Sequence, residues 1–343
     1  MSPSPPVSTS ARKSSIKLKD RSIALAPFVP PKTIEAPVRG RWTVLMSAAA
    51  RGDVDRVRWC LDQGVQPDRV DRRGWTALLL AAQAGHTDVV LLLLARGAAP
   101  DDATRDSWGR RLGGTPLHLV ASVGDVVAIT ALLDRGARID HPDTTGSTPL
   151  MNAAYRGHAP AVRLLVARGA SVMGRPKKTD GTPLFSAAVG GHVEVVSLLL
   201  ELGAAVDQIA QNGWTPMMWA AWHARVPVVR MLLAKGAAVD ARGADGATIL
   251  LRLANAGRSD AVETLIRAGA DPMATDARGR TVLDILENRR DAVFLENLDR
   301  ALAGAAGARV VSALPMGRAA RLLPRTHATW AAAHTASVWS RTP

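Results

Sequence analysis

The sequence predicts an all-α repeat solenoid, in which helix–turn–helix units stack side by side in chain order. The first observation is a threonine followed two places later by an apolar residue, recurring at spacings of 33, 39, 33, 34, 33, 33 and 33 residues. The second is a pair of glycine registers, nine and 21 residues after most of these threonines. A fixed period of this length is the sequence signature of a repeat architecture. The threonines are Thr43, Thr76, Thr115, Thr148, Thr182, Thr215, Thr248 and Thr281.

Each repeat is predicted to form two short helices. In the fifth repeat, Thr182 is expected as the N-cap, with Pro183 at the first helical position, where a missing N–H does no harm. Gly191 is expected to end this helix in the left-handed conformation. A second helix should run from Val193, with apolar residues at helical spacing, until Gly203 stops it. One such unit cannot bury its own apolar face, so it must stack on a neighbour.

The positive charge of the chain lies mostly at its two ends. Of the formal net charge of +13, residues 1–41 carry +6 and residues 304–343 carry +5. We therefore expect three parts: a Ser/Pro-rich basic tail over residues 1–38, a repeat domain over 39–302, and an Ala/Arg-rich tail over 303–343. Neither tail shows a sustained period, so both are expected to be largely disordered.

Composition excludes several classes of protein. The lone cysteine, Cys60, leaves no intrachain disulfide framework and no cysteine-rich metal site, and it is expected to be a small buried side chain. The longest strongly apolar run, residues 89–95, is too short to span a bilayer, and the N-terminus has no secretory apolar core. We expect a cytoplasmic monomer; an organelle-targeted or secreted protein is the alternative.

Three motifs within the period resemble the ankyrin repeat. The pattern T-P-L-H-x-x-A is intact over residues 115–121 and nearly intact after Thr148 and Thr182. A closing G-A-x-x-D follows the second helix of several repeats, for example from Gly203. The Gly-His pair after the first helix stands at residues 85–86, 157–158 and 191–192. The resemblance implies about eight repeats, each a β-turn finger plus a helix pair, with a concave face that binds partner proteins.

Departures from this pattern are local. Repeat six has Ala224 and Arg225 where Gly-His is expected, and repeats four and seven end in Met173 and Met273 instead of an acid. Repeat eight carries acidic residues among its apolar positions and is expected to be the C-terminal cap, since a terminal repeat needs a polar outer face.

The histidines are expected to be structural. His86, His118, His158 and His192 occupy the motif positions, where the resemblance implies a bridge between turn and helix backbones. No phosphate-binding loop, dinucleotide fingerprint, nucleophile elbow or zinc-protease motif is present. We expect no enzyme activity, no cofactor, no metal and no small-molecule substrate.

Partner binding is expected at two positions of each repeat: the turn tip just before the threonine, and the concave side seven and eight residues after it. Tryptophan, tyrosine and arginine dominate interface hot spots, and the basic excess on the tips suggests a protein partner with an acidic segment. Trp219 is expected in the core, and repeat seven is expected to contribute little. The candidate partner-binding residues are Arg72, Arg73, Trp75, Trp108, Arg110, Arg111, Tyr155, Arg156, Lys177, Lys178, Trp214, Trp222 and His223.

Some questions stay open at this point. The six-residue insertion over residues 99–114 is either a projecting finger with Trp108 near its tip or a tolerated surface insertion. The favoured function is a non-enzymatic interaction scaffold or adaptor. The alternative is a targeted or secreted effector-type protein whose N-terminal segment is an address signal. Contact of the basic tails with nucleic acid or an acidic membrane is less favoured, because the tails organise no groove-reading residues.

Overall fold

The computed structural model describes residues 42–71, 73–102, 113–174, 181–210, 213–258, 261–282, 284 and 285. These residues form fourteen α-helices and no extended strand, which confirms the predicted all-α repeat solenoid. The first helices of successive repeats pack on one another in chain order. They are α1 (Val44–Arg51), α3 (Ala77–Ala84), α5 (Pro116–Val123), α7 (Pro149–Arg156), α9 (Pro183–Gly190), α11 (Pro216–Trp222) and α13 (Ile249–Ala256).

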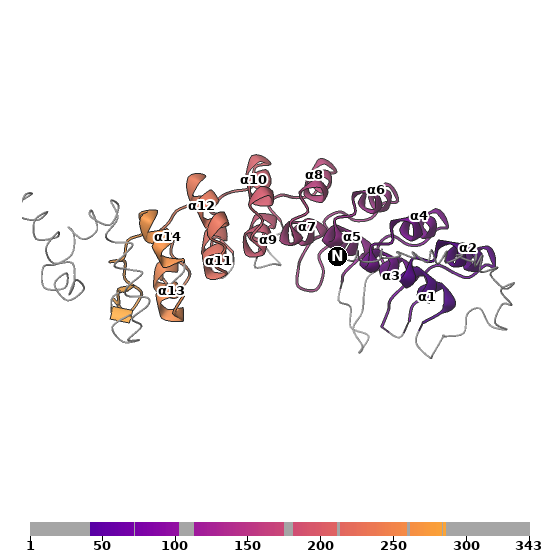
Figure 1. Ribbon diagram of the computed structural model, residues 1–343, viewed down its shortest axis with the longest axis horizontal. Helices are drawn as coiled ribbons and strands as arrows, with labels where there is room; N and C mark the ends of the chain where they lie inside the picture. The colour runs from indigo at the N-terminus through magenta and orange to yellow at the C-terminus, as the bar shows by residue number, and fades with distance from the viewer. Residues whose placement is uncertain are drawn as a thin grey trace, which may run out of the picture.

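The second helices form a parallel row behind the first. The stack is arched, and the odd-numbered helices lie on its concave side (Figure 1). The even-numbered helices are α2 (Val54–Asp62), α4 (Thr87–Ala95), α6 (Val126–Asp134), α8 (Ala159–Ala167), α10 (Val193–Glu201), α12 (Val226–Ala234) and α14 (Val262–Arg267). The odd-numbered helices are called the inner row below, and the even-numbered helices the outer row.

The repeated threonines and glycines set the ends of the inner helices. The Thr182 hydroxyl accepts a hydrogen bond from the Phe185 N–H at 3.2 Å, and the equivalent threonines before α1, α3, α7, α11 and α13 do the same. Gly124 ends α5 with φ +83°, and a Cβ there would lie 2.6 Å from Cγ of His158 in the next repeat. Glycine is required at this position both for its conformation and for the close approach of the next repeat.

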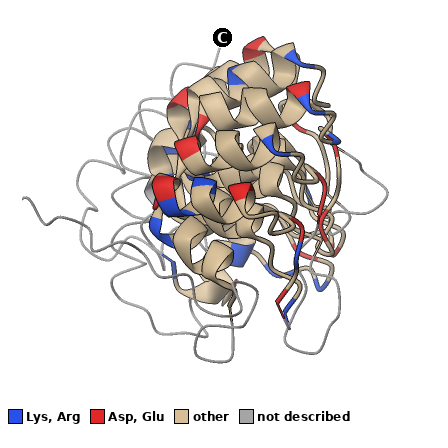
Figure 2. Ribbon diagram, turned by 90° about the vertical axis from the view of Figure 1, so that its right-hand side faces the viewer, with Lys and Arg blue, Asp and Glu red and all other residues tan. Residues whose placement is uncertain are grey.

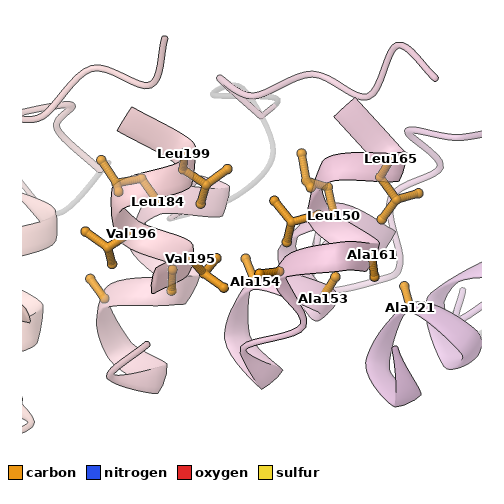
Figure 3. Packing of buried hydrophobic residues seen from close by; sticks show 14 of the residues in the cluster. Ala121, Leu150, Ala153, Ala154, Ala161, Leu165, Leu184, Val195, Val196 and Leu199 are labelled. Carbon is orange, nitrogen blue, oxygen red and sulfur yellow. The ribbon is translucent and has the colours of Figure 1, made fainter. Parts of the chain in front are cut away.

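Alanines and branched side chains fill the space between the two rows (Figure 3). Ala153 and Ala154 of α7 are fully buried, and so is Leu199 of α10. Small side chains on the inner row let neighbouring helices approach closely, whereas leucines and valines of the outer row fill the core. Cys60 is also fully buried within this core, as predicted, and burial raises the pKa of its thiol.

Hydrogen bonds between repeats come from the motif side chains. His86 Nε2 lies 3.2 Å from the Ala50 carbonyl oxygen, and His192 Nε2 lies 2.9 Å from the Tyr155 carbonyl oxygen. Each histidine therefore joins its own repeat to the C-terminal end of the preceding inner helix, which confirms the structural role. The closing aspartates accept backbone N–H bonds of the following repeat at 3.3 Å or less; they are Asp68, Asp101, Asp140, Asp207 and Asp240.

Several predictions lie outside the described residues. They concern both tails and most of repeat eight, including its capping role. The domain boundaries at residues 38 and 302 remain predictions.

Candidate protein-binding face

Acidic residues are segregated from the inner row. None of α1, α3, α5, α7, α9, α11 and α13 contains Asp or Glu. Three arginines stand on these helices: Arg51, Arg156 and Arg252. The acidic residues of the described chain lie mainly on the outer helices and on the turns (Figure 2). The concave side of the stack is therefore a surface without negative charge on its helices.

The exposed part of the inner row lies at the C-terminal ends of its helices. Tyr155 is 50% exposed at the end of α7, beside the exposed Arg156, as expected from their positions. Val123 occupies the position on α5 that Arg156 occupies on α7, and it is 43% exposed. Sequence reasoning missed Val123, although the register that identified Arg156 also identifies it. These residues, with Arg51, Trp222, His223 and Asn255, are called the inner face below.

Trp214 is buried, so its predicted exposure at a turn tip is wrong. Its side chain is only 8% exposed and belongs to the hydrophobic core. The ring centroid lies 4.8 Å from that of Trp219 and 5.6 Å from that of Trp222. Trp214 follows the turn glycine and directly precedes the N-cap threonine, so at this residue the chain has already returned to the helices. Ala247 stands in the same register and is buried too. Trp75, also in this register, is half-buried.

An aromatic cluster surrounds Trp214 in repeats five and six. Trp219 is half-buried and packs on the core as predicted, with its ring 5.3 Å from Phe185 and stacked at 5.6 Å on His223. Trp222 is half-buried as well. Desolvation, and then the charges of Arg225 and Arg258, lower the pKa of His223, so its neutral form is favoured at neutral pH.

Two arginines cover this cluster. The Arg252 guanidinium carbon lies 4.8 Å from the Trp214 ring centroid, and that of Arg258 lies 5.1 Å from the Trp222 centroid. Cations within about 6 Å of an indole face are attracted by its quadrupole. Repeat six also uses Arg225 where a histidine is usual: its Nε donates to the Val189 carbonyl at 3.1 Å, so the bridge to the preceding repeat is kept.

A cleft of about 720 Å³ lies between α11, α13 and the turn that precedes repeat eight. Sequence reasoning expected little from repeat seven, yet this repeat supplies half of the residues that line the cleft. Periodicity gives no signal for it, because the cleft depends on side chains from three repeats. It is lined by Trp222, Asp245, Ala247, Leu251, Arg252, Asn255, Ala256, Asp276, Ala277, Arg278, Arg280 and Ile285, and is called the repeat-seven cleft below.

The remaining candidate residues divide into two groups. Arg73 is exposed on its turn, and its backbone N–H donates to Asp71 at 2.8 Å. Six others lie outside the described residues: Arg72, Trp108, Arg110, Arg111, Lys177 and Lys178. The question of a projecting finger around Trp108 therefore stays open.

Over the described residues, no three His, Cys, Asp or Glu side chains gather closely enough to hold a metal ion. No helix in the described part of the chain has the length and apolar character to cross a membrane.

Family models of ankyrin repeats match most of the repeat region. The model for three copies matches residues 100–176 and 173–243, that for many copies matches residues 45–94, and that for a single repeat matches residues 245–277. The chain belongs to the ankyrin repeat family, which confirms the resemblance found in its sequence. Ankyrin repeats form protein–protein interaction modules, and their fold is generally a non-catalytic binding scaffold.

Among solved structures, the chain is similar to the crystal structure of the human ASB11 ankyrin repeat domain. The two share 30% sequence identity with a TM-score of 0.53, over 60% of this chain and 89% of that domain. No curated protein matches the sequence.

Proposed function

We propose that this protein is an interaction scaffold that binds an acidic segment of a partner protein on its inner face. The observation that supports this most is the absence of Asp and Glu from α1, α3, α5, α7, α9, α11 and α13. A surface of one sign attracts a partner of the other sign and speeds their encounter. Tyr155 and Trp222 on the same face belong to the residue types that anchor interfaces.

The ion pairs of the chain support the choice of the inner face. On the outer row, Arg96 pairs with Asp62 at 2.7 Å and Arg168 pairs with Asp134 at 2.8 Å, each across neighbouring repeats. In contrast, Arg51 and Arg156 of the inner row have no ion pair within the described residues and are exposed. The four charges of these outer pairs are thus compensated within the chain, whereas Arg51 and Arg156 are available to a partner.

The experiment that tests the proposal is selection from a random peptide display library with the full chain. We expect the selected peptides to be enriched in Asp and Glu, and their binding to weaken with added salt. The double variant Tyr155→Ala/Arg156→Gln should lose binding about tenfold, since it removes an aromatic anchor and a charge. Arg163→Gln is the matched control, because Arg163 is an exposed arginine on outer helix α8.

Two results would overturn the proposal. One is a selected set without acidic enrichment. The other is binding that survives Tyr155→Ala/Arg156→Gln but is lost in Arg163→Gln, which would place the partner on the outer row.

A further inference from the structure

The turn before repeat eight holds one arginine rigidly and leaves its neighbour unpaired. Asp276 accepts the backbone N–H groups of Arg278 and Arg280 at 2.9 Å each, and the Arg280 guanidinium donates to it at 2.9 and 2.7 Å. These hydrogen bonds hold the pKa of Asp276 below its ordinary value, and the bond from the Arg280 backbone N–H has the largest effect. Asp276 and Arg280 therefore neutralise each other at neutral pH. Arg278 is exposed, and its guanidinium has no ion pair within the described residues.

The opposite wall of the repeat-seven cleft is also internally compensated. The Arg252 guanidinium donates to Asp245 from above the Trp214 ring. Two charges are thus paired on each wall, and Arg278 is the charge left over. Among the described residues that line the cleft, Arg278 is therefore the charge without an ion pair, and it gives this lining a net positive charge.

Apolar side chains complete the lining of the cleft. Trp222 is half-buried, and Leu251 and Ile285, which also line the cleft, are buried at 2% and 4% exposure. The volume of about 720 Å³ falls in the usual range for ligand-binding clefts. Such a cleft has room for an apolar side chain beside a charged one. Trp222 belongs to the inner face as well, so a segment bound there continues into this cleft.

We infer that the repeat-seven cleft anchors the acidic partner segment: Arg278 binds the carboxylate of one Asp or Glu, and an adjoining apolar side chain packs against Trp222. This inference rests on the proposed function and names the anchor within it. A guanidinium matches a carboxylate with two parallel hydrogen bonds. A phosphate dianion would need further donors, and those of Arg280 and Arg252 are already engaged by Asp276 and Asp245.

The test is fluorescence anisotropy of the full chain with a fluorescein-labelled peptide of alternating Glu and Leu. We expect Arg278→Gln to weaken binding about tenfold, as loss of a charge-assisted contact does. Arg230→Gln on the outer helix α12 is the matched control, since Arg230 is also exposed and should leave binding unchanged. Trp222→Ala should weaken binding too, and a peptide with Gln in place of Glu should bind at least tenfold more weakly.

The outcomes separate this inference from the proposed function. If Arg278→Gln binds like the unaltered chain while Tyr155→Ala/Arg156→Gln weakens binding, the cleft is not the anchor and the proposed function stands. If neither variant changes binding, both fail. A Gln peptide that binds as tightly as the Glu peptide overturns carboxylate recognition, and so does tighter binding of a phosphoserine peptide. Arg278 is exposed on a turn, so its variant should keep the helical circular dichroism and melting midpoint of the original protein.

Discussion

Replacing Trp214 by alanine should destabilise the middle of the stack strongly. The side chain is 8% exposed, lies between Trp219 and Trp222, and is covered by Arg252. Its removal leaves a cavity bounded by two aromatic rings and a guanidinium. Because each repeat contacts only its neighbours, the damage should be greatest in repeats six and seven.

The magnitude follows from the buried area. A buried tryptophan removes about 200 Å² from water, which at about 25 cal/mol per Å² is about 5 kcal/mol. Lost ring–ring contacts add to this, and partial collapse of Trp219 and Trp222 into the cavity offsets part of it. The expected decrease in the free energy of unfolding is about 3–5 kcal/mol, the usual range for large aromatic truncations in a core.

Urea unfolding followed by circular dichroism measures this decrease, and hydrogen exchange shows where it falls. Trp75→Ala is the matched control: Trp75 stands in the same register of repeat two but is half-buried, so its loss should cost clearly less. A Trp214→Ala protein destabilised by under about 1 kcal/mol, the range of a surface site, would show that the side chain is not in the core. Faster exchange spread evenly over all repeats would refute the local coupling.

Three further predictions concern single positions. Cys60 is fully buried with a raised thiol pKa, so iodoacetamide should modify it only as fast as the protein unfolds; rapid modification of the native protein would contradict its burial. His118 Nδ1 accepts a hydrogen bond from the Thr115 N–H, and burial lowers the pKa of this histidine. The stability that neutral His118 contributes is therefore complete above its unfolded pKa of about 6.5 and is lost as the pH falls below that value. His118→Gln keeps a capping box without titrating, and its urea midpoint should fall less between pH 7.5 and 5; an equal fall would assign the effect to other groups. Ala224 has φ +55° at a position where six other repeats have glycine, so Ala224→Gly should stabilise the protein by about 0.5–1 kcal/mol. A lowered melting midpoint would contradict the strain argument.

The sequence determines the repeating parts of this fold, because each of them depends on local chemistry. A threonine hydroxyl accepts a hydrogen bond from the backbone N–H of the residue three places later and so caps the helix. A glycine nine places after the threonine ends the same helix, so both helix ends could be placed by counting. The burial of Cys60 follows in the same way from its place in the second helix.

The candidate site could be predicted only in part, because it depends on contacts between repeats. Tyr155 and Arg156 are placed by register alone, and their exposure follows. The position of Trp214 holds tryptophan, glycine, serine, alanine or arginine in other repeats, so it has no pattern from which burial can be inferred. Its burial results from Trp219, Trp222 and Arg252, the last from the next repeat. The repeat-seven cleft is missed for the same reason.

Helix physics alone does not account for the absence of acids from the inner row. The negative end of the helix dipole lies at the C-terminus, so it disfavours acidic residues in the last turn of every helix by about 0.3–1 kcal/mol. Yet α2 ends in Asp62, α6 ends in Asp134 and α10 ends in Glu201, all on the outer row. Asp62 and Asp134 form ion pairs with arginines of the following repeat, so on the outer row the unfavourable dipole energy accompanies a charge that makes an ion pair. The same dipole acts on the inner row, where no acid occurs and where Arg51 and Arg156 are left without an internal ion pair. The difference between the rows therefore lies in the surface that each presents, which supports recognition of an acidic partner by the inner face.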